Sequence, residues 1–342
     1  MAWPISGHDW AIALLRDSLA SGRLAHAYLF SGRPQIGKTT LALALAQAVN
    51  CTGAEAGDGD PPCGRCPACL KIAQGKHPDV RLIEGQGAGG ALKIDQVRAL
   101  QHEVVLRPYE GRYRVFILRQ ADRATTEAAD SLLKTLEEPP AHVLLILTAT
   151  HAEALPPTVA SRCQRLDLRP LTAGQVAEAL KARGVPPTKS RLLARLSGGR
   201  LGWAIRAGED ETLLAQRQQI LDHLVRLLAS SRVERLDFVW QSLQRLRDQE
   251  ARLEWARQLV ELWMGWWRDL FLLCTAGPEN IVNIDRLEEL QAWAEHSHSA
   301  QAWQALQALG ETAAQLEANI NIRLALEGLL LKLPRWPAAV AP

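Results

Sequence analysis

The sequence predicts an α/β amino-terminal half built on a parallel sheet, followed by a carboxyl-terminal half that is helical throughout. Two observations predict this division. Apolar, β-rich runs alternate with helical patterns up to about residue 170, and no convincing strand pattern follows "LRPLT" at 168–172. A chain of 342 residues is long enough for two or three domains.

Five apolar runs are expected to form the strands of this sheet. Helical patterns lie between several of them, such as "TTLALALAQAVN" after Lys38, "IDQVRALQHEVV" from Ile94 and "TEAADSLLKTLEE" from Thr126. "EEPPA" ends the third helix, because proline cannot continue it. Apolar strands separated by helices indicate a parallel sheet covered on both faces. The expected strands are "HAYLFS" from His26, "DVRLIE" from Asp79, "RVFIL" from Arg114, "VLLILT" from Val143 and "CQRLDL" from Cys163.

The second half shows helical periodicity only. Residues 172–207 indicate a small helical unit interrupted at "SGGRLG", and the chain is expected to be helical from about residue 210 to its end. Eight of the eleven tryptophans lie from Trp240 onward, which favours a bulky helical core. The segment "LVELWMGWWRDLFLLC" is so apolar that we expect it also to face another subunit. One helical face carries Leu253, Ala256, Val260, Trp263, Trp267 and Leu270.

Composition points to an ordinary globular protein. The net charge is +2 and 22% of residues are charged, so composition alone does not indicate nucleic acid or a membrane surface as the main partner. No apolar run reaches the length of a transmembrane helix, and the amino terminus lacks the layout of a signal peptide. We therefore expect a cytoplasmic protein without membrane partners.

"GRPQIGKTT" satisfies the G-x-x-x-x-G-K-[ST] phosphate-loop pattern between a strand and a helix. In such a loop, backbone N–H groups face phosphates, the lysine reaches the β/γ-phosphates and the first threonine faces Mg²⁺. A vestigial strand-to-helix turn is the alternative, because Pro34 has no N–H and Gln35 replaces a smaller residue. The expected nucleotide-binding residues are Gly32, Gly37, Lys38, Thr39 and Thr40.

The strand "RVFIL" lacks the acidic ending that ATP hydrolysis usually requires. It is followed by Arg119 and Gln120, and neither side chain can take a proton from water. Asp122 is the nearest carboxylate, but we expect it to belong to the following turn and give it little weight as a metal partner. The pattern favours binding of ATP and Mg²⁺ without efficient hydrolysis.

Four of the six cysteines form a C-x11-C-x2-C-x2-C cluster. Two overlapping C-x-x-C turns in a reducing compartment suit tetrahedral Zn²⁺, and four protein ligands make the metal structural rather than catalytic. Free thiols and an iron–sulfur cluster are the alternatives. The expected ligands are Cys51, Cys63, Cys66 and Cys69.

Together these motifs resemble the clamp-loader branch of AAA+ proteins, and within it the delta prime subunits of bacterial DNA polymerase III. The resemblance covers nearly the whole chain. Besides the phosphate loop and the cysteine cluster, it rests on "GRLAHAYLFSG", "LLKTLEEPP", "LPPTVASRC" and "NINIRLALEGLLLKLP".

The resemblance implies three domains: a RecA-like AAA+ P-loop core over 1–169 with a zinc-binding module at 51–69, a helical lid over 170–208, and an all-α collar over 209–342. It implies a hetero-pentamer with gamma/tau and delta subunits that acts on a sliding clamp and primed DNA. It also implies that Arg162 of "SRC" is an arginine finger, reaching ATP bound by a neighbouring subunit.

Several departures and rival interpretations remain. Gly202 and Trp203 stand where motor subunits carry a sensing arginine; Arg200 and Arg206 lie nearby without an assigned role. The main rival is a gamma/tau-like motor subunit that hydrolyses ATP itself. A ring member that binds no nucleotide is a second. Nucleic-acid binding by the zinc module is a weaker third, because that segment has no dense basic patch.

Overall fold

The computed structural model describes residues 3, 5–55, 60–86, 90–318 and 320–335. They form two compact units, Met1–Ala179 with Gly199–Trp203, and Leu180–Gly198 with Ala204–Pro342. Residues 56–59 of the predicted zinc module, and residues 319 and 336–342 of the predicted collar, lie outside the described part. The predicted lid, 170–208, is shared between the two units, so the three-domain division stays a prediction.

The first unit is built on a five-stranded parallel sheet in the order β2-β3-β4-β1-β5. All five predicted strands are present. Every residue of β1 and β4 is buried, which explains why these runs are apolar without alternation. The strands are β1 (Ala27–Ser31), β2 (Val80–Ile83), β3 (Arg114–Leu118), β4 (Val143–Ala149) and β5 (Gln164–Asp167).

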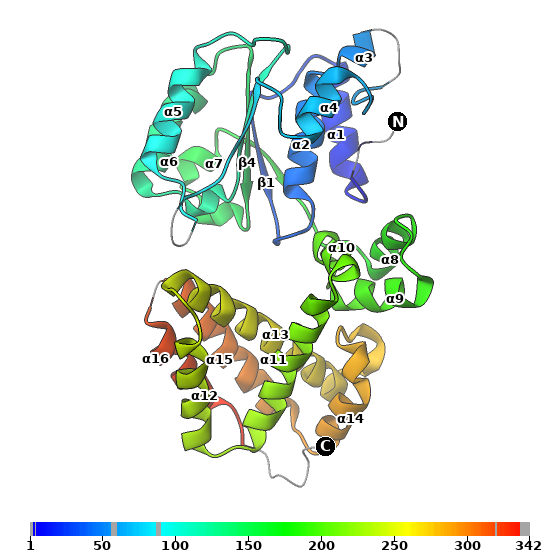
Figure 1. Cartoon of the computed structure of the whole chain (residues 1–342), viewed down its shortest axis with the longest axis vertical. Helices are drawn as coiled ribbons and strands as arrows, with labels where there is room; N and C mark the ends of the chain where they lie inside the picture. Colours follow the sequence, from blue (N-terminus) through cyan, green and yellow to red (C-terminus); the bar gives the residue numbers. More distant parts are fainter. Residues whose placement is uncertain (1–2, 4, 56–59, 87–89, 319, 336–342) are drawn as a thin grey trace. The chain divides into compact units, whose positions relative to one another are not determined.

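Helices cover both faces of this sheet, and Figure 1 shows α1 and α2 on one side and α5, α6 and α7 on the other. Tyr28 and Phe30 of β1 join the apolar core on the α1–α2 side, whereas Leu29 joins the core on the α5–α7 side. The helical elements are α1 (Asp9–Ala20), α2 (Lys38–Val49), α3 (Thr52–Glu55), α4 (Pro67–Ala73), α5 (Ile94–Val104), η1 (Ala121–Arg123), α6 (Thr126–Glu137), η2 (Ala152–Ala154), α7 (Pro157–Ala160) and α8 (Ala173–Lys181).

The rest of the described chain is helical, as predicted. Side-chain caps begin several of these helices: Asp210, Asp248 and Asn321 each accept a backbone N–H of the first turn, and Ser231 forms a capping box with Glu234. The elements are α9 (Pro187–Leu196), α10 (Leu201–Glu209), α11 (Glu211–Ala229), α12 (Arg232–Gln244), α13 (Gln249–Thr275), η3 (Pro278–Asn280), η4 (Ile284–Arg286), α14 (Leu287–Glu295), α15 (Ser299–Glu317) and α16 (Ile322–Lys332).

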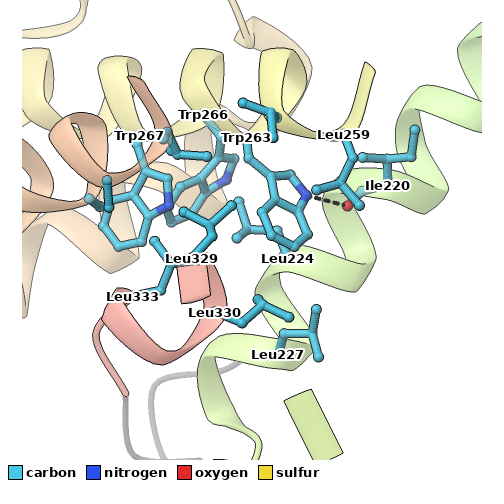
Figure 2. Close-up of a cluster of buried hydrophobic side chains, with 14 of the residues drawn as sticks. Ile220, Leu224, Leu227, Leu259, Trp263, Trp266, Trp267, Leu329, Leu330 and Leu333 are labelled. Carbon is cyan, nitrogen blue, oxygen red and sulfur yellow. Dashed lines mark hydrogen bonds between the residues drawn. The ribbon is translucent and has the colours of Figure 1, made fainter. Parts of the chain in front are cut away.

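The core of the second unit is centred on tryptophans of α13. Figure 2 shows Trp263 packed among leucines of α11 and α16, with its Nε1 donating a hydrogen bond to the carbonyl of Ile220 at 3.1 Å. The predicted face of α13 is confirmed as buried from Ala256 to Leu270, whereas Leu253 is partly buried. Trp266, on another side of the helix, is also fully buried and donates to Glu289 of α14 at 3.2 Å. Helices of the same chain therefore cover Trp266, and the predicted contact of α13 with another subunit stays a prediction.

None of the described helices is both long enough and apolar enough to cross a bilayer.

Candidate functional site

The phosphate-loop motif forms the predicted turn between a strand and a helix. Residues 32–37 connect β1 to α2, whose first residue is Lys38. Gly32 and Gly37 have φ angles of 138° and 109°, which favour glycine. A Cβ on Gly32 would also lie 2.4 Å from the carbonyl oxygen of Leu168. The loop therefore has glycines at the two motif positions whose backbone requires them, and Thr39 and Thr40 lie in the first turn of α2.

The two unusual loop positions have structural partners. Gln35 has a φ of 65°, an uncommon conformation for a residue with a side chain. Its carbonyl accepts the N–H of Gly202 at 2.9 Å, and a Cβ on Gly202 would lie 2.8 Å from that same oxygen. The next carbonyl, of Ile36, lies 2.9 Å from Nε2 of the buried His8. The loop is thus held through its carbonyls. No motif in the sequence indicates this role for His8.

Lys38 is bound within its own loop. Its Nζ donates to the carbonyls of Gly32 and Arg33, the latter at 2.8 Å. Burial lowers the pKa of Lys38 to about 8; Asp122 acts in the opposite direction, and Arg119 lowers the pKa further. Cationic Lys38 is thus less favoured than an exposed lysine would be, and an anionic phosphate beside it would restore the charged form.

The end of β3 carries no carboxylate, as the sequence predicts. The guanidinium of Arg119 pairs with Glu84, which follows the edge strand β2. The backbone N–H of Gln120 donates to the hydroxyl of Thr148 at 3.2 Å. A guanidinium and an amide cannot act as a general base, so neither Arg119 nor Gln120 can activate water.

Asp122 lies in η1, the turn after β3, where the sequence analysis placed it. Its Oδ2 accepts the backbone N–H of Thr150 at 2.8 Å. Because β3, β4 and β1 are neighbours in the sheet, Asp122, Thr150 and the phosphate loop all follow carboxyl ends of adjacent strands. Ligands of open α/β sheets bind at this edge. No sequence pattern shows which direction a turn carboxylate faces, so the contact between Asp122 and Thr150 could not be predicted from the sequence.

The four clustered cysteines converge in space. Their Sγ atoms all lie within 4.8 Å of one another, and all four residues are buried. Tetrahedral zinc with Zn–S bonds of about 2.3 Å would set sulfurs about 3.8 Å apart, so the cluster fits the ion with small adjustments. Gln47 of α2 donates to the carbonyl of Cys69 at 2.9 Å and thereby fastens the cluster to the phosphate-loop helix. None of the six cysteines, including the half-buried Cys163 and Cys274, forms a disulfide.

The surroundings of the cluster favour thiolates at some positions. Burial opposes ionisation of Cys66, but hydrogen bonds from the Thr52 side chain and the backbone N–H groups of Cys69 and Gly53 lower its pKa to about 5. Backbone hydrogen bonds, led by that of Arg65, lower the pKa of Cys63. Burial raises the pKa of Cys69. A divalent cation would offset the mutual repulsion of the thiolates.

Arg162 follows α7 and is about one-third exposed. Its Nη2 lies 2.7 Å from Oε1 of Glu137, the residue that ends α6, and its Nη1 donates to the carbonyl of Thr158 at 2.8 Å. The packing of α6 and α7 places them over the sheet face opposite to α2. Arg162 therefore belongs to a different layer from the helix that Lys38 begins.

Comparisons with known proteins agree with these features. The model of the family described as "DNA polymerase III, delta subunit" matches residues 7–172. DNA polymerase III subunit delta' of Bacillus subtilis (strain 168) is 28% identical over 320 residues, which cover 94% of each chain. DNA polymerase III subunit tau of Salmonella typhimurium is 37% identical over 177 residues, but these cover 52% of this chain and only 27% of that protein.

One solved structure supports the fold assignment over nearly the whole chain. It is that of a DNA polymerase III gamma subunit-related protein from Thermotoga maritima, with a TM-score of 0.50 and 15% identity, covering 93% of this chain and 97% of the other. At this identity the likeness concerns the fold alone. It extends through the parallel sheet and into the helical second half.

Proposed function

We propose that the chain belongs to the delta prime family of DNA polymerase III clamp-loader subunits and is the stator-like member of such a loader. It would assemble with gamma/tau and delta subunits in the cytoplasm as part of a hetero-pentamer. The complex would open a sliding clamp and place it on primed DNA. The near-complete match to a delta' subunit carries this assignment, because the match to tau covers only about a quarter of tau.

The chain's own phosphate loop would bind ATP with Mg²⁺ and hydrolyse it slowly or not at all. Gly32, Gly37, Lys38, Thr39 and Thr40 would contact the phosphates and the metal. The single observation that supports slow hydrolysis is the end of β3, where a guanidinium held by Glu84 replaces an acidic group. The chain would therefore bind ATP at its phosphate loop without hydrolysing it efficiently, because no acidic side chain directly follows β3 to activate water.

Arg162 would act on ATP bound by a neighbouring subunit. Its location over the sheet face opposite to α2 favours action across a subunit boundary over action on its own phosphate loop. Its ion pair with Glu137 is partly exposed, and such pairs contribute only about 0–1 kcal/mol, so the guanidinium can exchange this partner for a phosphate. An arginine finger is worth roughly 10³–10⁵ in the rate of phosphoryl transfer.

The four cysteines would hold a structural Zn²⁺. The ion would link the end of α2 to α4, and no open coordination position would remain for substrate. The hydrogen bond from Gln47 to the carbonyl of Cys69 would connect the zinc-bound segment to α2, the helix that begins with Lys38. The module would therefore support the nucleotide site from the far end of α2.

Reconstitution with gamma/tau and delta subunits tests the arginine finger. Arg162→Ala is expected to leave ring assembly intact and to lower clamp-dependent ATPase activity. The loss should equal the fraction of that activity contributed by the neighbouring ATP site that Arg162 contacts. Arg165→Ala is the matched control, because Arg165 is a nearby exposed arginine paired with Glu153 and Asp167. An assembled Arg162→Ala ring with undiminished ATPase activity would show that the assignment is wrong.

An active motor subunit is the second candidate. The complete loop from Gly32 to Thr40 and the 37% identity to tau favour it. It requires that this chain alone hydrolyse ATP and lose that activity on Lys38→Ala. It therefore makes the opposite prediction for the isolated protein.

A further inference from the structure

Asp122 has one carboxylate oxygen without a hydrogen-bond partner. Its Oδ1 is buried and contacts no donor among the described residues, whereas its Oδ2 accepts the N–H of Thr150 at 2.8 Å. Buried polar atoms nearly always have a partner, and an unpartnered carboxylate oxygen is costly to keep away from water. The Oδ1 atom is therefore available to accept a hydrogen bond or to bind a cation.

A chain of hydrogen bonds connects this carboxylate to the phosphate loop. Thr150 donates its N–H to Asp122, and its carbonyl accepts the N–H of Gly32 at 3.2 Å. The carbonyl of Gly32 in turn accepts from Nζ of Lys38. The carboxylate is also close enough to Lys38 to raise the pKa of that amine against the effect of burial. Asp122 is therefore built into the nucleotide site rather than lying beside it.

The local charges explain why a single acid here would matter. Arg119 is paired with Glu84, so the local charges that matter are the amine of Lys38 and the carboxylate of Asp122. A metal-free nucleotide would be attracted by the first and repelled by the second. With Mg²⁺ on its phosphates, the same nucleotide would present a cation that a carboxylate favours. The contribution of Asp122 to binding thus changes sign with the metal.

We propose that Asp122 holds the Mg²⁺ of nucleotide bound at the phosphate loop, together with the hydroxyl of Thr39, in place of the acids that β3 lacks. The inference rests on the nucleotide binding proposed above. Asp122 would be a metal-positioning residue and not a general base, because Oδ2 accepts the N–H of Thr150 and Oδ1 would be occupied by the metal. The subunit could then keep a magnesium-dependent nucleotide site without gaining a hydrolytic one.

Calorimetric titration of the full chain with ATP, in Mg²⁺ or in EDTA, tests this role. Asp122→Asn preserves the side-chain shape and an acceptor for Thr150 but removes the charge. We expect Mg²⁺ to strengthen ATP binding about tenfold or more in the wild type and about twofold or less in Asp122→Asn. In EDTA, Asp122→Asn should bind ATP as tightly as the wild type or more tightly. Asp130→Asn, an equal charge change on the exposed surface of α6, should retain the full effect of Mg²⁺.

The outcomes separate this inference from its premise. An Asp122→Asn protein with the wild-type response to Mg²⁺ overturns it, and so does one that loses affinity equally with and without the metal, which would indicate a purely structural role. A wild type that binds no ATP under either condition refutes the nucleotide site itself, and Asp122 with it. That result is visible before any substitution is made. Asp122→Ser gives the same comparison should Asp122→Asn not fold.

Discussion

Nucleotide affinity is expected to depend steeply on pH because of Lys38. Burial lowers the pKa of its amine to about 8 in the free protein, and bound phosphates would raise it again. Since the pKa of Lys38 is then higher in the complex than in the free protein, binding is coupled to uptake of a proton above about pH 8. Affinity should therefore be highest below that pH and fall as pH rises. The protonated fraction of a group with this pKa drops from about 0.9 at pH 7 to about 0.1 at pH 9, which weakens binding on the order of tenfold.

Titration of the full chain with Mg²⁺-ATP at several pH values between 7 and 9 measures this effect. Lys38→Arg is the control, because a guanidinium stays charged throughout and should remove the slope even if it weakens binding. Affinity that is constant from pH 7 to pH 9 in the wild type would refute the reasoning, since it would mean that Lys38 is fully charged before the phosphates arrive. A slope of equal size in Lys38→Arg would assign the titration to another group.

Two further substitutions test the zinc site and the helical second unit. Cys66→Ser removes one of the four proposed ligands and should weaken zinc binding by about 3 kcal/mol, on the order of 100-fold, as measured by competition with a metal indicator. Cys274→Ser is the control and should retain the wild-type zinc affinity. Equal zinc affinity in both variants would argue against the four-cysteine site. Arg235 is buried and donates to carbonyls at the ends of α11 and α16, so Arg235→Met should cost about 3 kcal/mol and lower the melting temperature by about 10 °C. Exposed Arg232→Met should change it little; a loss under 1 kcal/mol for Arg235→Met would mean that water replaces the guanidinium.

The secondary-structure elements could be predicted because the patterns that determine them lie within short stretches of the sequence. The strands were found from their apolar runs, and the phosphate loop from its position between a strand and a helix. The buried face of α13 followed from helical spacing, and the end of α6 from the prolines after Glu138. Each of these features depends on residues within about ten positions of one another, and there the physical rules are strong.

Contacts between distant segments could not be predicted in the same way. The N–H of Gly202 donates to the carbonyl of Gln35, which is 167 residues away in the sequence (202 − 35). The N–H of Thr150 donates to Asp122, which is 28 residues away. Arginine usually lies on the exposed face of a helix, yet Arg235 is buried and its guanidinium donates to backbone carbonyls. Trp266 lies outside the predicted buried face of α13, and only the tertiary structure reveals that α14 of the same chain contacts it.

The most direct test of the proposed separation between binding and hydrolysis is steady-state ATPase activity of the isolated, pure chain. With no acidic group at the end of β3, turnover should stay at background with Mg²⁺ and primed DNA, and Lys38→Ala should not change it, while the same chain binds ATP. Vigorous turnover that Lys38→Ala abolishes would contradict this and would identify the chain as a motor subunit.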